Sequence, residues 1–410
     1  MANEPKEVIE LFLTGGVGTS GEDFKVKFSR LVRAVPKIHS PLRPEFFPYF
    51  FLGSVLTLPY TKLNDEIGIE GSSVKITSKE TIKLAFKIEK DQKTKLVFKT
   101  IAVVDRVHKA QRLTVDEFKE ALGSLDLTQD ELNNCEVEGE IVHIKDRKVN
   151  LGKLEVLGKG ELNSEMLKNL GPLPGYKEET AKFKKVKKNV AVSNFDNALK
   201  NFSNTESARK GVEEFLKNLA QIYRSEKALP GLDDTEIKNR MKLADSEAAY
   251  HGFTYGVMAM NFKYKYALDI RAEPIAGKGY ADLMVISRHD KGKNKRWDSP
   301  LCTFEGKRGE KETAEHGVGQ IKRKKYDRPQ PPVRAIVKKE VGQSGAAKGR
   351  VRAGFNYSLD PGRGGVLVEV EDAQEFIEPK SFKELFQKGS ILKGEIERKL
   401  SDLYYTNSHY

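Results

Sequence analysis

Three charged residues in one stretch of the chain have the types and spacing of a hydrolytic metal site. Asp282 begins one short apolar segment, and Glu305 and Lys307 end a second one. Residues two apart on a strand point to the same face, so Glu305 and Lys307 can converge, and a hairpin would bring Asp282 beside them. Two carboxylates and a lysine at one sheet edge fit a divalent cation with a second positive charge beside it. Solvated edge residues are the alternative, since 32% of the chain is charged.

The elements that would position these residues are predicted by the apolar pattern of residues 205–410. An amphipathic helix around Phe215 and a longer helix from Asp234 to about Met260 precede three strands. A polar, basic insertion at residues 288–300 would form a loop between the second and third strands, where added residues are tolerated. The predicted ranges are, in order, strands 265–272, 281–287 and 301–306, helix 313–326, strands 333–338, 351–357 and 366–370, and helices 381–387 and 391–404.

The sequence pattern of residues 1–160 predicts a separate unit of helices and strands that precedes residues 205–410 in the chain. Thr114 and Glu117 have the spacing of a capping box, which should start a helix that runs to about Leu122. A break rich in proline and glycine and a run of lysines indicate a basic linker over residues 161–204. The fold class is therefore α/β, with mixed sheets flanked by helices, in units 1–160 and 205–410. The earlier unit is predicted to hold helices 7–13, 21–35 and 45–58, strands 73–76, 82–88 and 95–104, and half-exposed strands within 135–157.

Composition indicates the kind of partner and the compartment. A chain of 410 residues accommodates two or three domains. Its net charge of +12 favours a polyanionic partner such as a nucleic acid, because phosphate neutralisation dominates such binding. Its two cysteines are far apart, which argues against a disulfide framework or a structural zinc site and fits a cytoplasmic location. The sequence shows no signal peptide and no membrane-spanning run, so no membrane partner is expected.

Four motifs follow one another in the order of a known nuclease family. Together they resemble the PD-(D/E)XK nuclease superfamily, most closely the AAA-ATPase-associated bacterial nuclease domain that also occurs in cytoplasmic-incompatibility-type toxins. Ala281 stands where the proline that names the motif would be, a departure that is common in the superfamily. The motifs are Ser246-Glu247-Ala248-Ala249-Tyr250-His251-Gly252, Glu273 with the glycine turn from Gly277 to Asp282, Glu305-Gly306-Lys307, and Gln320-Ile321 with Tyr326.

The resemblance implies a restriction-endonuclease-like fold for residues 205–410 and a nuclease that depends on Mg²⁺ or Mn²⁺. Its catalytic residues would be Asp282, Glu305, Lys307 and Gln320. Lys307 would orient or deprotonate the attacking water, and Gln320 would hydrogen-bond a phosphate or Lys307. The metal would be held by Asp282, Glu305 and the backbone carbonyl of Gly306, with Glu247 or Glu273 assisting. Nucleic acid would be contacted by Lys322, Arg323, Lys325 and Arg308.

The resemblance also implies a biological setting. The substrate would be DNA rather than RNA, and the protein would be a toxin or effector component of bacterial origin, with a cognate protein partner or antitoxin. It would act in the cytoplasm or be delivered into a host cell. The alternative functions are a catalytically inactive nuclease-fold protein that binds nucleic acid or a protein, and a structural protein whose basic surface binds an acidic partner.

Several of these residues have simpler alternatives. Glu247 can be a solvated helix residue, and Glu273, which precedes Pro274, can be a turn residue. A lone histidine such as His251 is more often packed or capping than functional, so it is left outside the predicted site. The basic residues around Lys322 can form an exposed helix face.

The N-terminal unit resembles a degenerate copy of the C-terminal one. Lys83 takes the place of Asp282, and Lys99 takes the place of Glu305. With lysines at both positions, this pseudonuclease unit would hold no metal and would serve as a scaffold or a binding surface. Chance similarity between two α/β units is the rival interpretation.

Overall fold

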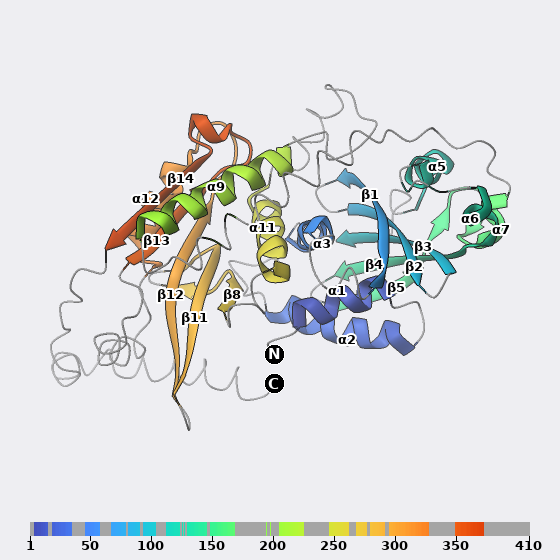
Figure 1. The fold of residues 1–410 in the computed structure, drawn as a ribbon, viewed down its shortest axis with the longest axis horizontal. Helices are drawn as coiled ribbons and strands as arrows, with labels where there is room; N and C mark the ends of the chain where they lie inside the picture. The colour runs from blue at the N-terminus through green and yellow to red at the C-terminus, as the bar shows by residue number, and fades with distance from the viewer. Residues whose placement is uncertain are drawn as a thin grey trace. The chain divides into compact units, whose positions relative to one another are not determined.

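The structure is a computed structural model built around two five-stranded mixed sheets with helices on their faces (Figure 1). Residues 1–372 form one compact unit. Among the described helices, none is both long and apolar enough to span a bilayer. The structure describes residues 4–14, 19–34, 46–57, 67–78, 81–90, 93–103, 112–123, 125, 127, 129–145, 148–168, 194, 197, 205–224, 246–261, 268–276, 279–291, 295–327 and 349–372.

The first sheet has the strand order β1-β2-β3-β4-β5. Its β3–β4 pair is parallel and its other pairs are antiparallel. Helix α5 lies in the crossover between the two parallel strands, as parallel pairing requires a long connection. The elements are α1 (Glu4–Thr14), α2 (Thr19–Ala34), α3 (Phe46–Thr57), β1 (Ile69–Ser78), β2 (Thr81–Lys90), β3 (Lys93–Val103), α5 (Val115–Gly123), α6 (Gln129–Asn134), β4 (Glu136–Lys145), β5 (Lys148–Lys153), β6 (Glu155–Val156), β7 (Gly160–Glu161) and α7 (Ser164–Lys168).

The second sheet has the order β14-β13-β12-β11-β8. Its β12–β13 pair is parallel, with α12 in the crossover, and its other pairs are antiparallel. The elements are α9 (Thr205–Arg224), α11 (Glu247–Asn261), β8 (Leu268–Ala272), β9 (Ile275–Ala276), β10 (Gly279–Tyr280), β11 (Leu283–Lys291), β12 (Lys295–Gly306), α12 (Ala314–Lys324), β13 (Gly349–Phe355), the 3-10 turn η4 (Pro361–Arg363) and β14 (Val366–Asp372).

Helices cover both faces of the second sheet. Val285 and Phe304 belong to a core shared with α9 and α11, whereas Met284 packs with Ile321 of α12 on the opposite face. Strands covered on both sides have apolar residues on both faces, which explains the continuous apolar run Leu283-Met284-Val285-Ile286. The site-bearing end of this sheet is therefore enclosed between α11 and α12.

The predicted fold class is confirmed, and the predicted capping box is present. Thr114 Oγ1 accepts from the Glu117 N–H at 3.1 Å, and Glu117 Oε2 accepts from the Thr114 N–H at 2.9 Å. The predicted strands 82–88 and 95–104 correspond to β2 and β3, and helix 45–58 corresponds to α3. The predicted strand 333–338, the helices 381–387 and 391–404, and the start of the helix at Asp234 lie outside the described residues.

The prediction of a loop over residues 288–300 is wrong. Strand β11 continues to Lys291 and β12 begins at Lys295, so most of this insertion extends the hairpin, with Arg288 paired to Asp298 and His289 to Trp297. Backbone ladder hydrogen bonds form whatever the side chains are, so a polar composition did not reveal the strands.

Lys99 does not take the place of Glu305. It lies on the face of the first sheet opposite α5, with its ammonium 2.8 Å from Glu140 Oε2 and 5.8 Å from the ring centroid of Phe12. Its neighbour Phe98 packs on Phe118 of α5 instead. Glu305, in contrast, contacts Gln320 of the crossover helix α12, so the predicted equivalence of Lys99 and Glu305 is wrong.

Candidate functional site

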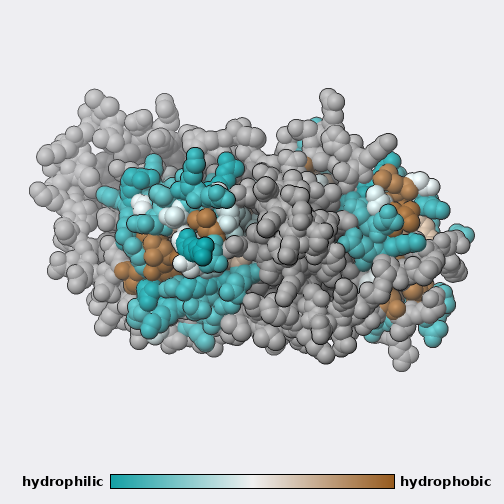
Figure 2. All heavy atoms as spheres, turned by 90° about the horizontal axis from the view of Figure 1, so that it is seen from above, coloured by the Kyte–Doolittle hydropathy of each residue, from teal (hydrophilic) through white to brown (hydrophobic). Residues whose placement is uncertain are grey.

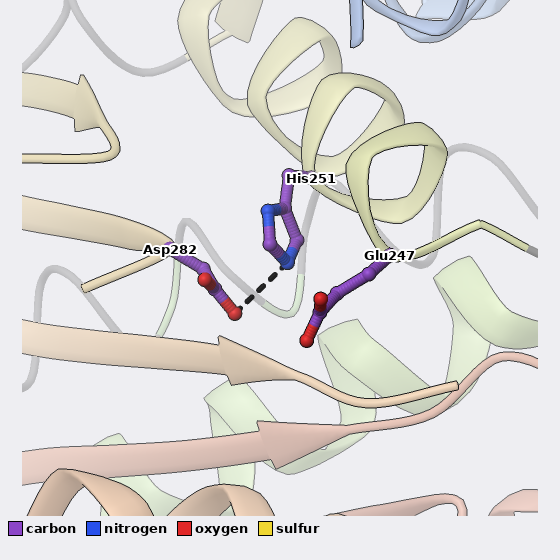
Figure 3. A group of neighbouring side chains, drawn as sticks. All are labelled: Glu247, His251 and Asp282. Atoms are coloured by element: carbon purple, nitrogen blue, oxygen red, sulfur yellow. Dashed lines mark ion pairs between the residues drawn. The ribbon is translucent and has the colours of Figure 1, made fainter. Parts of the chain in front are cut away.

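Helix α11 directs an acid and a base towards the end of β11. Glu247 and His251 are one helical turn apart and therefore share a face of the helix. Both side chains point at Asp282, which immediately precedes β11 (Figure 3). Ligand atoms from these three residues all lie within 4.8 Å of one another. His251 is fully buried, so its polar ring nitrogens are withheld from bulk water.

Asp282 is fixed by the backbone on both sides. Its Oδ2 accepts from the Gly306 N–H at 2.6 Å, and its carbonyl accepts from the Glu273 N–H at 2.8 Å. Gly306 is required by close approach, since a Cβ at this position would lie 2.8 Å from His251 Nε2. The hairpin thus locks the carboxylate of one strand to the backbone of the next, with the imidazole pressed against both.

Glu305 and Lys307 converge as the strand period predicts. Lys307 Nζ lies 3.0 Å from Glu305 Oε1 and 3.4 Å from Glu247 Oε1. The side-chain amide of Gln320, a residue of α12, donates to the same oxygen of Glu305. Its other oxygen, Oε2, is buried and has no hydrogen-bond partner among the described residues.

The positive groups of the site are held in their charged forms. Burial opposes charge on His251, but the carboxylates of Asp282, Glu273 and Glu247 outweigh it and raise the pKa of His251 to about 10. Burial likewise opposes charge on Lys307, yet Glu305 and the other carboxylates raise its pKa above the usual value. Lys307 is therefore an ammonium at neutral pH and can donate hydrogen bonds but not accept a proton.

The two central carboxylates differ in their environment. Burial raises the pKa of Asp282, but the charge of His251 more than offsets this and holds the pKa below its usual value. Burial and the nearby charge of Asp282 instead raise the pKa of Glu305 well above its usual value, and Lys307 only partly compensates. Together with Glu247 and Glu273, these residues set four carboxylates against the two cations His251 and Lys307, an imbalance that a bound cation relieves.

A divalent metal fits this arrangement. His251 Nε2 lies 2.8 Å from Asp282 Oδ2 but without the alignment of a hydrogen bond. Two ligands on adjacent positions of an octahedral ion, with bonds of about 2.1 Å, lie about 3 Å apart. Glu305 Oε2, which has no hydrogen-bond partner among the described residues, is a further oxygen ligand at the same end of the sheet.

Glu273 occupies a strained backbone conformation next to the site. Its φ of 50° is left-handed, which is uncommon for a residue other than glycine. The side chain is buried, and its Oε1 lies 3.9 Å from His251 Nδ1. Glu273 thus approaches the far side of the imidazole, while Asp282 approaches the near side.

The structure brings together most, but not all, of the residues proposed for the site. Lys307 and Gln320 both contact Glu305, and Lys307 also contacts Glu247. Asp282 lies at the same end of the sheet, where it accepts a hydrogen bond from the Gly306 N–H. The basic residues lie on the surface instead. Arg308, Lys322, Arg323 and Lys325 are exposed, and Lys322 forms an ion pair with Glu369 of β14.

His251 is the site residue that the sequence prediction left out. A helical Glu-x-x-x-His spacing places Glu247 and His251 on one face, and this was the available signal. A single histidine in an apolar helix is nevertheless a weak indication, because its role depends on which strand end the helix packs against.

Comparison with known families agrees with this geometry. Residues 245–341 match the family model described as the PD-(D/E)XK nuclease superfamily. The match begins two residues before Glu247 and extends beyond α12, so it includes every residue of the cluster around Asp282. No curated protein matches the chain. The resemblance inferred from the four sequence motifs is confirmed for this segment.

Proposed function

We propose, from the PD-(D/E)XK nuclease superfamily segment at residues 245–341, that the chain is a metal-dependent nuclease. The observation that carries this proposal is the enclosed cluster in which four carboxylates surround one imidazole and one ammonium; the carboxylates are those of Glu247, Glu273, Asp282 and Glu305. Buried carboxylates without matching cations are costly, and a site retains them where they bind a metal or substrate. The reaction would be hydrolysis of a phosphodiester bond of a nucleic acid.

Asp282, Glu305 and His251 would hold the ion, with Glu247 beside them. A bound divalent ion lowers the pKa of a water ligand and offsets charge on the phosphate. Carboxylates suit Mg²⁺, while an imidazole also suits Mn²⁺ and other transition ions. His251 must release a proton before its nitrogen can bind a metal, since a ligand has to be deprotonated.

Lys307 and Gln320 have distinct tasks in this proposal. Lys307, as an ammonium, would donate to a non-bridging phosphate oxygen or to the attacking water and would stabilise the charge that develops there. Gln320 holds Oε1 of Glu305 through its amide and so fixes the direction of the carboxylate. Because Lys307 is an ammonium at neutral pH, its proposed role is to orient the water or the phosphate rather than to abstract a proton.

The substrate proposal rests on charge. The net charge of +12 favours a polyanion. The described surface in Figure 2 carries mainly hydrophilic residues, with hydrophobic patches among them. Arg308, Arg323 and Lys325 are exposed on the segments that flank the cluster and would contact phosphates. We propose DNA as the substrate, and the resemblance to toxin nucleases adds a toxin or effector role with a cognate partner.

The proposal is tested on the purified full-length chain with end-labelled duplex DNA, single-stranded DNA and RNA. Mn²⁺ or Mg²⁺ should give cleavage that EDTA stops, and Asp282→Asn should abolish it while the circular dichroism spectrum is retained. The matched control is Asp116→Asn, which changes an exposed aspartate of α5. Its cleavage rate should equal that of the wild type.

The outcomes separate the alternatives. Salt-sensitive binding of DNA or RNA without cleavage by the wild type would assign the inactive, nucleic-acid-binding alternative. Neither binding nor cleavage would favour the basic structural protein. Cleavage of RNA alone would retain the nuclease and correct its substrate.

A further inference from the structure

The two halves of residues 1–372 have the same sheet topology. In each, two antiparallel pairs lead to a parallel pair, followed by an antiparallel edge strand, and a helix fills the crossover of the parallel pair. The crossover helices even begin alike, because the N–H of Thr114 donates to Glu117 Oε2 and the N–H of Thr313 donates to His316 Nδ1, both at 2.9 Å. We infer that the N-terminal half is a metal-free copy of the nuclease fold whose helix α3 positions α11, and with it Glu247 and His251.

The face that holds the carboxylates has lost them in the N-terminal half. Antiparallel register pairs Lys83 with Thr100 and Thr81 with Ala102 on the α5 side of β2 and β3. None of these four residues is a carboxylate, whichever pair corresponds to Asp282 and Glu305. Lys83 itself is engaged, with its ammonium 2.8 Å from Glu117 Oε2.

Helices α3 and α11 pack against each other through reciprocal contacts. Gly53 of α3 faces the carbonyl oxygen of Phe253, and Gly256 of α11 faces the carbonyl oxygen of Phe50. Each glycine follows the phenylalanine of its own helix by the same interval. Contacts exchanged in this way are those of a twofold interface, formed here between two parts of one chain. When Gly53 is aligned with Gly256, Pro48 of α3 corresponds to His251 of α11.

This interface lies directly behind the proposed site. Gly252 follows His251 and approaches the carbonyl oxygen of Phe46, so no side chain separates the two helix backbones. The rings of Phe46 and Phe50 each lie 5.7 Å from the ring of Tyr255. Helix α11 is therefore held against α3 at the turn that carries His251, and a shift of α11 against α3 would change the approach of His251 to Asp282.

The inference rests on the proposed metal site, and metal binding tests it without reference to cleavage. Mn²⁺ titration of the full-length chain, followed by electron paramagnetic resonance, should show one tight site per chain that Asp282→Ala removes. Gly53→Ala should weaken this site by about tenfold or more, the usual effect of altering a group that orients a ligand. Its new methyl group meets the backbone of α11, which has to shift as a helix.

Gly139→Ala is the matched control. Its methyl group would press on Leu162 and Leu154 in the other core of the N-terminal half, away from α11. It should lower thermal stability but leave the Mn²⁺ affinity unchanged. Phe50→Leu, which removes a ring contact without adding bulk, gives a second test if Gly53→Ala fails to fold, and it should also weaken Mn²⁺ binding.

Equal Mn²⁺ affinities in the α3 variants and the Gly139→Ala control would overturn the inference and leave the nuclease proposal standing. A second tight site that survives Asp282→Ala would also overturn it, because the N-terminal copy would then hold a metal. Absence of Mn²⁺ binding by the wild type would overturn both proposals.

Discussion

His251 Nε2 lies 2.8 Å from Asp282 Oδ2, so a helix and a strand of the second sheet meet at a buried imidazole–carboxylate contact. The contact joins His251, which the sequence analysis left outside the site, to Asp282, which it placed within it. It also explains why Gly306 has no side chain, since the ring fills the space that a Cβ would need. The imidazole is thereby a candidate ligand rather than a packed core residue.

Replacement of His251 tests its role as a ligand. His251→Ala should weaken Mn²⁺ binding by about tenfold or more, because removing a metal ligand lowers the affinity at least as much as removing a group that orients a ligand. Isothermal titration with MnCl₂ measures the effect. His143→Ala, which changes a half-buried histidine of β4, is the control and should bind Mn²⁺ like the wild type. Unchanged affinity in His251→Ala would remove the imidazole from the site.

The stability of the metal-free protein should depend on the charge of His251. Its pKa is raised from the usual value of about 6.5 to about 10 in the folded state, so the folded state binds a proton that the unfolded state releases. The contribution is fully present below about pH 6.5 and is lost as the pH rises through about 10. Thermal unfolding in EDTA should therefore show a falling melting temperature over this window, and His251→Leu should flatten the slope. A wild-type slope of the opposite sign would contradict the ion pair.

The contribution of Asp282 to stability has the opposite pH dependence and is lost at low pH. Its pKa is held below the usual value, because His251 and the Gly306 N–H more than offset burial. Its contribution to stability is present above the unfolded pKa of about 4 and is lost as the pH falls through the lowered folded value. Acid unfolding followed by circular dichroism should begin at higher pH in Asp282→Asn than in the wild type. Coincident acid transitions would show that the carboxylate is not stabilised by its neighbours.

Gln320 should matter to the site although it would not bind the metal. Gln320→Leu leaves Oε1 of Glu305 without its amide donor, so the carboxylate can turn, and Mn²⁺ affinity should fall about tenfold. Gly319→Ala is the control on the same helix. A Cβ there meets open space, and alanine should stabilise the helix by about 0.5–1 kcal/mol without any effect on Mn²⁺. Equal affinities in the two variants would make Gln320 merely structural.

Strand periodicity accounts for what could be predicted of the site. Glu305 and Lys307 are two apart on one strand, and Asp282 lies across a hairpin, so local geometry was enough to bring them together. The capping box at Thr114 was equally local. The insertion at residues 288–300 was mistaken for a loop because polar side chains hide a ladder that is made by the backbone.

Long-range packing accounts for what was missed. The role of His251 depends on where α11 packs, and no pattern within α11 specifies that place. Lys99 was placed on the wrong face because a one-residue shift in alignment reverses the side of a strand, and the face is revealed by the contacts of Lys99 with Phe12 of α1 and of Phe98 with Phe118 of α5. The glycines shared by α3 and α11 could be understood only as a pair, from the contacts that they exchange.

The most direct test of the nuclease assignment measures metal binding and cleavage on the same preparation of Lys307→Met. In the proposed function the ammonium would supply charge to the reaction without binding the metal, so this variant should still bind Mn²⁺ and should lose about 100-fold or more in cleavage rate. Lys311→Met, which changes an exposed lysine four residues further along, should behave as the wild type in both measurements. Cleavage by Lys307→Met at the wild-type rate would contradict the account.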